Sequence, residues 1–401
     1  MRVLCTCLPG HGHFNPMLAL AQALARAGHE VAFATAADFC PRVERAGFTA
    51  FPAGLPLAAQ MEQARQRFPD QDELSAMQRF EQFVPRMLAG VAAPARAQGL
   101  FPVVEGWRPD LLVHDETEFA GPVVAAAAGI LWADQSVGIL RPLSMARLAG
   151  EVLAPLAERH GADVGPNGGL FRYLYLDVAP PSLQSDEIGQ VPVAHPVQNA
   201  AIDPGAEGEE LPDWVEDLPA DPVIYVSLGT VFNARAHDVF AAVLEGLRDA
   251  DASVIVTVGP DIDPARFGPQ PGHIHVERFI PQSLLLHRCD AVVNQGGTAL
   301  LPILAQGLPV LVLPQGANQF HNAAACVAAG VGRRLLPGEV TPNAVRQEVD
   351  ALLTDPDLRS RAQQVQTEMV AMPGPERGVE LLERLAAERR PVTAGTGGAS
   401  S

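Results

Sequence analysis

The sequence predicts an α/β protein of two doubly wound units, each with a parallel β-sheet flanked by helices. Apolar, strand-like runs alternate with helical patterns along the chain, and glycine-containing turns follow several of these runs. A segment rich in proline, glycine and acidic residues divides the alternation in two. The chain of 401 residues is also long for a single core and suits two domains of roughly 200 residues.

The first unit opens with a strand, a loop and a helix. Residues 3–8 are a short apolar run, Asn15 and Pro16 are typical of a helix start, and Gly28 is typical of a helix end. Residues 135–190 are expected to be irregular. Together with the helix expected at 70–98, they are expected to shape a cleft for an acceptor molecule. Plain core packing explains the residues of both regions equally well. The other elements expected are strands at 31–35, 111–114 and 130–133 and helices at 70–98 and 119–128.

The second unit repeats this alternation after the linker. We expect an N-terminal domain at 1–202, a linker at 203–222, a C-terminal domain at 223–375, a terminal helix at 376–390 and a disordered tail at 391–401. The elements expected in the second unit are strands at 223–228, 253–258, 291–294 and 310–313 and helices at 238–248, 299–306, 320–328 and 342–353.

Composition excludes several classes of function. The chain has 28 basic residues, all arginine, against 46 acidic ones, for a net charge of −18. A negative field repels nucleic acid and anionic lipid, so an anionic ligand must be held by local backbone dipoles and a few side chains. The longest apolar stretch, about 121–133, is short for a bilayer, and the N-terminus does not resemble a signal peptide.

The five cysteines show no metal-ligand spacing, which indicates a reducing, cytoplasmic compartment and no metal site. Asp261 and Asp263 form a DxD-like pair, but they follow a strand in a loop rich in glycine and proline. We interpret this pair as a solvated loop.

Two stretches of the first unit could supply a base. Residues 9–16 read PGHGHFNP and follow the first strand, where ligands bind in open α/β sheets. His13 could take a proton from a hydroxyl there, and Asp115, which ends a later strand, could orient its imidazole. Each residue also has a plain structural interpretation, His13 as a hydrogen-bonded loop residue and Asp115 as a helix cap.

Three stretches of the second unit could hold an anion or a sugar. Residues 292–299 read VVNQGGTA, a strand that meets a helix through two glycines, and a helix N-terminus favours a diphosphate. Asn318 and Gln319 could bond to sugar hydroxyls, although Asn318 could equally be an N-cap. Residues 227–230 read SLGT and could supply hydroxyls and an N–H to phosphates.

In this order and spacing, the stretches resemble the family 1 glycosyltransferases of the GT-B fold, and most closely the actinobacterial branch that glycosylates natural products. The likeness spans about residues 1–390 and is strongest at 12–16, 278–282 and 289–332. It implies two facing Rossmann-like domains, with the acceptor bound by the N-terminal one and the nucleotide sugar mainly by the C-terminal one. We also expect a terminal helix that returns to the N-terminal domain, and inverting transfer without metal or cofactor, because backbone dipoles can stabilise the developing charge.

The resemblance assigns roles to individual residues. It implies that His13 is the general base and Asp115 its acidic partner. The implied donor site comprises Ser227, Gly229, Thr230, Phe279, Ile280, Gln282, Gln295, Gly296, Gly297, Thr298, Asn318, Gln319 and Asn322. The expected acceptor site comprises Gly12, Phe14, Met77, Phe80, Phe83 and Met87.

The chain departs from the family pattern at the donor site. Gln295 replaces the usual phosphate-contacting histidine, Ala299 and Leu300 replace a Gly-Thr pair, and Asn318 replaces an aspartate. The expected substrates are a dTDP- or UDP-sugar and a small apolar natural product, and a homodimer is compatible with the sequence. Three alternatives remain: a catalytically weak partner that activates another enzyme, a sugar-nucleotide epimerase of the same fold, and a transferase for lipid-linked or cell-wall acceptors.

Overall fold

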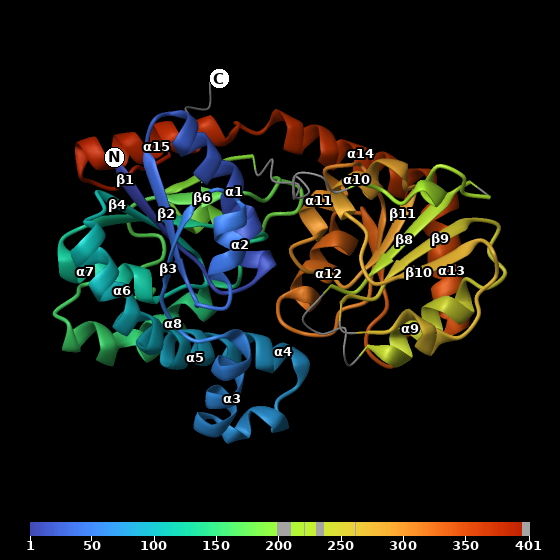
Figure 1. Ribbon diagram of the computed structural model, residues 1–401, viewed down its shortest axis with the longest axis horizontal. Helices are drawn as coiled ribbons and strands as arrows, with labels where there is room; N and C mark the ends of the chain where they lie inside the picture. Colours follow the sequence, from blue (N-terminus) through green and yellow to red (C-terminus); the bar gives the residue numbers. More distant parts are fainter. Residues whose placement is uncertain (199–209, 220, 230–235, 261, 395–401) are drawn as a thin grey trace. The chain divides into compact units, whose positions relative to one another are not determined.

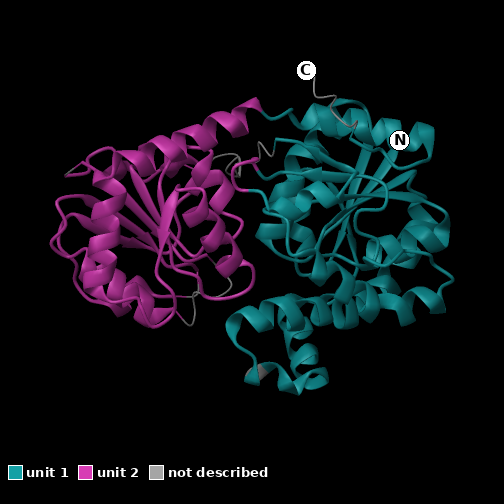
Figure 2. Cartoon of the chain, turned by 180° about the vertical axis from the view of Figure 1, so that it is seen from behind, with its two compact units in different colours: residues 1–179, 184–201, 372–401 teal, residues 180–183, 202–371 magenta. Residues whose placement is uncertain are grey.

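The computed structural model of the protein describes residues 1–198, 210–219, 221–229, 236–260 and 262–394 (Figure 1). The chain divides into two compact units (Figure 2). Unit 1 contains residues 1–179, 184–201 and 372–401, and unit 2 contains residues 180–183 and 202–371. Much of the expected linker, 203–209 and 220, lies outside the described residues, as do residues 395–401 of the expected tail.

Unit 1 contains a sheet of seven parallel strands in the order β3-β2-β1-β4-β5-β6-β7. The expected strands are present, and β3, β6 and β7 are additions because they are too short to give a clear pattern. The bounds are β1 Arg2–Thr6, β2 Glu30–Thr35, β3 Thr49–Pro52, β4 Leu111–Asp115, β5 Leu131–Gln135, β6 Tyr175–Asp177 and β7 Ala194–Pro196.

Both faces of this sheet are covered, because side chains alternate along each strand. Leu4 packs in one apolar core with residues of α6 and α7, whereas Val3 and Cys5 pack in the other core with residues of α1 and α15. The main helices of unit 1 are α1 His11–Arg26, α2 Cys40–Arg45, α3 Leu57–Arg67, α6 Ala93–Trp107, α7 Ala120–Ala128, α8 Leu143–Arg159 and α15 Pro375–Glu388.

The last helix, α15, belongs to unit 1. Leu382 and Leu385 are buried in the core that contains Leu20 of α1, and a Cβ at Gly378 would lie 2.7 Å from the Leu20 side chain. The start of the expected disordered tail is packed too, since Val392 is buried and its N–H donates to the Tyr173 carbonyl.

The long helical stretch expected at 70–98 runs instead over 76–107, as α4 Ala76–Gln78, α5 Val84–Met87 and α6, with π-helical turns at Arg79–Phe83 and Leu88–Ala92. Ala76–Trp107 is long and apolar enough to span a membrane by length and composition, although the sequence indicated 121–133 as the longest apolar stretch. About 61% of its most apolar window is buried within the protein, however, and Ala97, Leu100 and Val104 belong to the core.

Residues 135–190 were expected to be irregular, and this prediction is wrong, because they contain the 17-residue helix α8. Gly150 and Pro155 suggest breaks in a helix but lie inside it. Gly150 allows a close approach instead, since a Cβ there would lie 2.1 Å from the Pro166 carbonyl oxygen.

The first helix begins earlier than expected. It starts at His11, so Asn15 is not its N-cap and Pro16 lies inside it. Pro16 is the sixth residue of the helix, and because it has no N–H it cannot donate the helical bond to the Gly12 carbonyl. His13 is consequently carried by a helix rather than by a loop.

Unit 2 contains a sheet of six parallel strands in the order β10-β9-β8-β11-β12-β13. Apolar residues of α9 and α13 pack on one face of it, around Ile224, Val226 and Val254. The strands are β8 Val223–Ser227, β9 Ser253–Thr257, β10 Ile274–Glu277, β11 Ala291–Asn294, β12 Val310–Val312 and β13 Gly332–Arg334. The helices are α9 His237–Gly246, α10 Gln282–Leu285, α11 Leu300–Leu304, α12 Gln319–Ala328, α13 Pro342–Thr354 and α14 Pro356–Ala371.

Candidate active site

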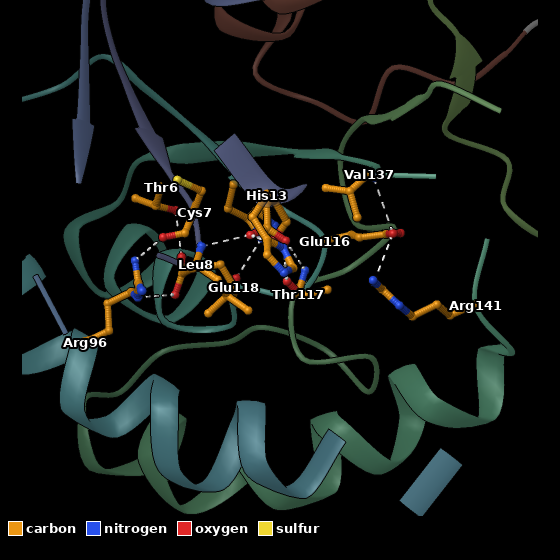
Figure 3. A network of polar contacts seen from close by, with 12 residues as sticks. Thr6, Cys7, Leu8, His13, Arg96, Glu116, Thr117, Glu118, Val137 and Arg141 are labelled. Atoms are coloured by element: carbon orange, nitrogen blue, oxygen red, sulfur yellow. Dashed lines mark hydrogen bonds and ion pairs between the residues drawn. The ribbon is translucent and has the colours of Figure 1, made fainter. Parts of the chain in front are cut away.

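His13 and Asp115 meet at the carboxyl edge of the unit 1 sheet (Figure 3). His13 lies on the first turn of α1, and Asp115 is the last residue of the adjacent strand β4. His13 Nδ1 lies 3.3 Å from Asp115 Oδ2, and the two side chains are 28% and 0% exposed. The pair thus combines a partly exposed imidazole with a fully buried carboxylate.

Thr117 completes this arrangement and was not identified from the sequence. Its hydroxyl donates to Asp115 Oδ1, its N–H donates to the same oxygen over 2.8 Å, and its Oγ1 lies 3.1 Å from His13 Nδ1. The Thr117 hydroxyl donates its only proton to Asp115, so Thr117 Oγ1 accepts a hydrogen bond from His13 Nδ1. His13 Nδ1 therefore carries the ring proton, and His13 Nε2 can accept a proton from a substrate. The Asp-x-Thr spacing is typical of an Asx turn and is the signal that could have identified Thr117.

Asp115 is held in its ionised form. Burial by itself raises the pKa of its carboxyl group. The charge and hydrogen bond of His13, with the bonds from Thr117 and the Leu8 N–H, outweigh burial and hold this pKa well below its usual range. The site therefore keeps a fixed negative charge beside the imidazole, which favours the imidazolium once Nε2 takes a proton.

A buried ion pair between Arg96 and Glu118 holds the end of β1, the strand that leads to the helix carrying His13. Arg96 donates to the Cys7 carbonyl and lies 3.6 Å from Glu118. Glu118 in turn accepts from the Thr6 hydroxyl over 2.6 Å and from the first N–H groups of α7. Both charged side chains are 1% exposed, so each depends on the other for compensation.

A second buried pair supports the turn after β4. His114 Nδ1 lies 2.8 Å from the Glu118 carbonyl and 3.0 Å from that of Asp115, and its Nε2 lies 2.7 Å from Asp134. Burial lowers the pKa of His114, but the bond and charge of Asp134 raise it more, so its pKa is above the usual value. Since carbonyl oxygens only accept, Nδ1 donates to them and holds residues 115–118 in place.

An apolar pocket in unit 1 adjoins this site. Thr117 lines it, together with Val84, Pro85 and Leu88 from the α5 segment and Met145 from α8. Glu116 and Arg141 lie at the same pocket and form an ion pair of 3.0 Å (Figure 3). A ligand in the pocket would therefore lie beside the residue that contacts His13.

None of the six expected acceptor residues lines this pocket, and their role stays a prediction. Gly12 is next to His13 on α1, and Phe14 is buried against Phe33 and Phe39. Phe80, Phe83 and Met87 are buried and Met77 is 41% exposed, and the pocket wall is formed by the neighbouring face of the same helical stretch. Helical periodicity identified an apolar stripe but could not distinguish a core face from a pocket face.

The expected donor residues of unit 2 gather at the carboxyl ends of adjacent parallel strands. Asn294 joins two of these ends, since its Nδ2 donates to the Ser227 carbonyl over 3.1 Å and its Oδ1 accepts from the Gly296 N–H over 2.7 Å. Gln295 packs tightly against Gly229, where a Cβ would lie 2.3 Å from Gln295 Nε2 and φ is +71°. Glycine is required at 229 because of both this contact and its backbone angle.

The loop before α12 lies at the same edge. Gln319 Oε1 accepts from the N–H groups of Gln315 and Gly316, so this side chain shapes the loop. Asn318 immediately precedes α12, but its side chain makes no capping bond. Asn322 donates to the Gly296 carbonyl over 2.7 Å, which ties α12 to the glycine turn that contains Gly297 and leads to Thr298.

The remaining expected donor residues follow β10, except for Thr230, which lies outside the described residues. Phe279 is 63% exposed, Ile280 is buried, and Gln282 begins α10. Of the DxD-like pair, Asp261 is not described, and Asp263 lies 3.4 Å from Arg278. Within the described ranges, no group of three or more His, Cys, Asp or Glu side chains could hold a metal ion.

Comparison with known proteins identifies the family. The model of the erythromycin biosynthesis protein CIII-like N-terminal domain matches residues 22–229, and that of the C-terminal domain matches residues 241–385. The L-demethylnoviosyl transferase of Streptomyces niveus is 33% identical, over 98% of this chain and all of its own length. The 10-deoxymethynolide desosaminyltransferase of Streptomyces venezuelae is 27% identical, over 97% of this chain and 98% of its own.

Solved structures agree with this assignment. The glycosyltransferase SnogD from Streptomyces nogalater is 30% identical, with a TM-score of 0.74 over 96% of this chain and 99% of its own. The spinosyn rhamnosyltransferase SpnG in complex with thymidine diphosphate is 25% identical, with a TM-score of 0.79 over 96% of this chain and all of its own. The prediction of two Rossmann-like domains is confirmed.

Proposed function

Since the chain belongs to the erythromycin biosynthesis protein CIII-like family of glycosyltransferases, we propose that it moves a sugar from a nucleoside diphosphate onto a hydroxyl of a small apolar natural product, with inversion. The observation that supports this most directly is the His13 imidazole, whose Nδ1 is held by Asp115 and Thr117. This arrangement leaves Nε2 as the proton acceptor.

The reaction is a direct displacement. His13 Nε2 takes the proton of the acceptor hydroxyl while its oxygen attacks the anomeric carbon, and the bond from that carbon to the diphosphate breaks. The proton stays on His13, whose new charge is balanced by Asp115, and the electron pair leaves with the nucleoside diphosphate. Attack opposite to the leaving group inverts the configuration at the anomeric carbon.

The glycine turn after β11 is the proposed seat of the leaving diphosphate. The Gly296 N–H donates to Asn294, but backbone N–H groups of the residues that follow it can stabilise the developing charge without a metal ion or cofactor. Among the described residues, the buried oxygens Gln295 Oε1 and Asn322 Oδ1 have no hydrogen-bond partner. Hydroxyl groups of a bound sugar could donate to them.

Thymidine diphosphate is the proposed leaving group, because SpnG is described in complex with it and because relatives transfer deoxysugars, as the name aclacinomycin-T 2-deoxy-L-fucose transferase shows. A reducing compartment such as the cytoplasm is proposed because all five cysteines are free and buried.

The test uses the full chain with a panel of dTDP- and UDP-sugars and small phenolic or alcoholic acceptors, and it detects diphosphate release and the glycosylated product by mass spectrometry. His13→Ala is expected to lower the turnover rate by about 10² to 10⁴-fold while leaving thymidine diphosphate binding unchanged. The matched control is His160→Ala, at an exposed histidine at the end of α8. Near-normal transfer by a folded His13→Ala protein would discard the base assignment, and a retained anomeric configuration would discard the direct displacement.

A second candidate is a catalytically weak partner that activates another enzyme. It is favoured by Gln295, which stands where the family resemblance implies a phosphate-contacting histidine. It is opposed by the intact contacts among His13, Asp115 and Thr117. Thymidine diphosphate binding without any turnover across the panel, and without turnover in the Gln295→His variant, would support this candidate.

A further inference from the structure

The apolar pocket of unit 1 has one strongly polar end. Glu116 follows β4 directly, Arg141 precedes α8, and Tyr175 opens β6. Glu116 accepts from Arg141 Nη1 over 3.0 Å and from the Tyr175 hydroxyl over 2.8 Å. The Val137 N–H also points at this carboxylate, at 3.5 Å (Figure 3). The proposed base and displacement need none of these groups.

At this polar end of the pocket, the hydrogen-bond acceptor is occupied, whereas several hydrogen-bond donors are not. Three donors from three chain segments already surround the Glu116 carboxylate, and its side chain is only 4% exposed. Arg141 has five N–H groups and is 17% exposed, and its one hydrogen bond to the described part of the protein goes to Glu116. The groups that remain for a ligand are therefore donors, which fit a ligand oxygen that accepts.

The charge of this polar end favours an uncharged ligand. Arg141 and Glu116 contribute one charge of each sign within a single ion pair. A carboxylate that approached the Arg141 guanidinium would also approach the Glu116 carboxylate, and that repulsion is strong in an apolar pocket. A ketone or lactone carbonyl accepts the same hydrogen bonds without that penalty.

The position of the pocket connects this contact to the reaction. Thr117, the residue after Glu116, lines the same pocket and has its Oγ1 3.1 Å from His13 Nδ1. A molecule anchored at Arg141 would therefore extend past the residue that orients the proposed base. This is the placement that an acceptor hydroxyl requires.

The pocket must widen to admit such a molecule. Its free volume is about 30 Å³, far below the roughly 300 to 1,000 Å³ of usual ligand sites. The wall at Val84, Pro85 and Leu88 lies where two π-helical turns flank α5. Such turns are common at functional sites, and a shift of this segment would open the pocket.

We propose that Arg141, held in place by Glu116, determines acceptor specificity by binding an uncharged carbonyl oxygen of an otherwise apolar acceptor. This inference rests on the proposed transfer to such an acceptor. Glu116 and Tyr175 act through Arg141 and are positioning residues.

Calorimetric binding of three probes to the full chain, without a donor, tests the proposal at a pH where the phenol is neutral. The probes are 7-hydroxycoumarin with its lactone carbonyl, chroman-7-ol without a carbonyl, and 7-hydroxycoumarin-3-carboxylate with an added anion. The wild-type protein is expected to bind 7-hydroxycoumarin about tenfold more tightly than either of the others. Arg141→Gln should bring the first two probes to equal affinity. Glu116→Gln should shift the preference about tenfold toward the carboxylate, because the cation is then unbalanced.

Arg147→Gln is the matched control, since Arg147 is exposed on α8 and does not line the pocket. It should keep the wild-type ratios, and melting temperatures verify that each variant is folded. Equal binding of chroman-7-ol by the wild type, no binding of any probe, or an unchanged ratio in Arg141→Gln would each overturn the proposal. If Glu116→Gln does not fold, the Arg141→Gln ratio decides alone. The assay needs no sugar donor, so it separates the two proposals. The expected affinity ratio without sugar transfer would contradict only the proposed function. Sugar transfer without that affinity ratio would contradict only the role of Arg141.

Discussion

The two units bury different kinds of polar groups. Among the described residues, the buried Asp, Glu, Arg and His side chains all lie in unit 1: Arg96, His114, Asp115, Glu116, Glu118, Asp134 and Asp177. The buried polar side chains of unit 2, in the same part of the chain, are all neutral: Ser253, Thr257, Ser283, Asn294, Gln295, Gln319 and Asn322. The two sheets have the same parallel design, so this difference is independent of the fold.

The two kinds of buried polar group suit two different chemical tasks, balancing the charge of a base and holding an anionic leaving group. A base needs a fixed counter-charge, and unit 1 supplies one at Asp115, supported by further buried pairs. An anionic leaving group can be held by neutral dipoles, and unit 2 offers amide side chains and glycine turns. It follows that the pH dependence and the large effects of substitution should concentrate in unit 1.

The largest effect is expected from breaking a buried pair of unit 1. Arg96→Met should lower the free energy of unfolding by about 3 to 5 kcal/mol, because Glu118 is left buried with an uncompensated charge. Urea-induced unfolding measures the change, and Arg65→Met, at an exposed arginine of α3, is the control. The double variant Arg96→Met, Glu118→Gln should recover part of the loss. If it recovers nothing, the two charges are not coupled.

The next effect concerns pH. Burial raises the pKa of Asp177 from 3.8 to about 6 despite hydrogen bonds from Gln184 and Ala179. The folded protein therefore holds this proton more tightly than the unfolded chain, so the stability that Asp177 contributes is lost as pH rises from about 4 to about 6, by about 3 kcal/mol at most.

Asp177→Asn should abolish that part of the pH dependence and raise the melting temperature at pH 8 relative to the wild type. Asp251→Asn, at an exposed carboxylate of unit 2, should change nothing in this window. A melting temperature that falls between pH 4 and pH 6 by the same amount in Asp177→Asn as in the wild type would remove Asp177 as the cause.

The proposed catalytic pair, His13 and Asp115, should show a smaller free-energy effect with a clear kinetic signature. Asp115→Asn removes the counter-charge of His13 and should lower kcat by about 100-fold, or about 2.7 kcal/mol, with little change in the KM of the donor. Steady-state kinetics with varied donor measures both constants. Asp38→Asn, at an exposed carboxylate of unit 1, serves as the control. A loss confined to KM would mean that Asp115 serves binding rather than proton transfer.

The smallest effect is expected in unit 2. Gln295→Ala should weaken thymidine diphosphate binding by about tenfold, because one neutral hydrogen bond is lost. The loss should be the same from pH 6 to pH 8, since an amide does not titrate. Calorimetry measures it, with Gln363→Ala on the exposed face of α14 as the control. A pH-dependent loss would show that a charged group shares the site and would weaken the contrast between the units.

Local patterns predicted most of the long elements but misjudged several boundaries. The strand runs at β1, β4, β8 and β11 were found because apolar runs followed by glycine or polar turns are local signals. Helix α8 was missed because residues 135–190 are rich in glycine and proline, whereas Gly150 lies inside the helix and allows a close contact with the distant Pro166 carbonyl.

The candidate site was predicted in part for a similar reason. His13 and Asp115 were singled out because His13 follows one strand and Asp115 ends another, and both strands end at the same edge of a sheet. Thr117 and Arg141 were not, because their roles depend on the directions of side chains brought together from distant segments. For the buried Phe80, apolar periodicity indicated a buried face without indicating what covers it, so its acceptor role stays a prediction.

By itself, the sequence determined that the protein has two parallel α/β units and that its polar loops lie at the carboxyl ends of their strands, because periodicity and turn residues act over a few neighbours. Only the tertiary structure decided which residues contact His13 Nδ1, which residues line the pocket and how the charge of Arg141 is balanced by that of Glu116. These contacts join residues far apart in the chain, and burial fixes their geometry because a buried charge must find its partner wherever the fold places it.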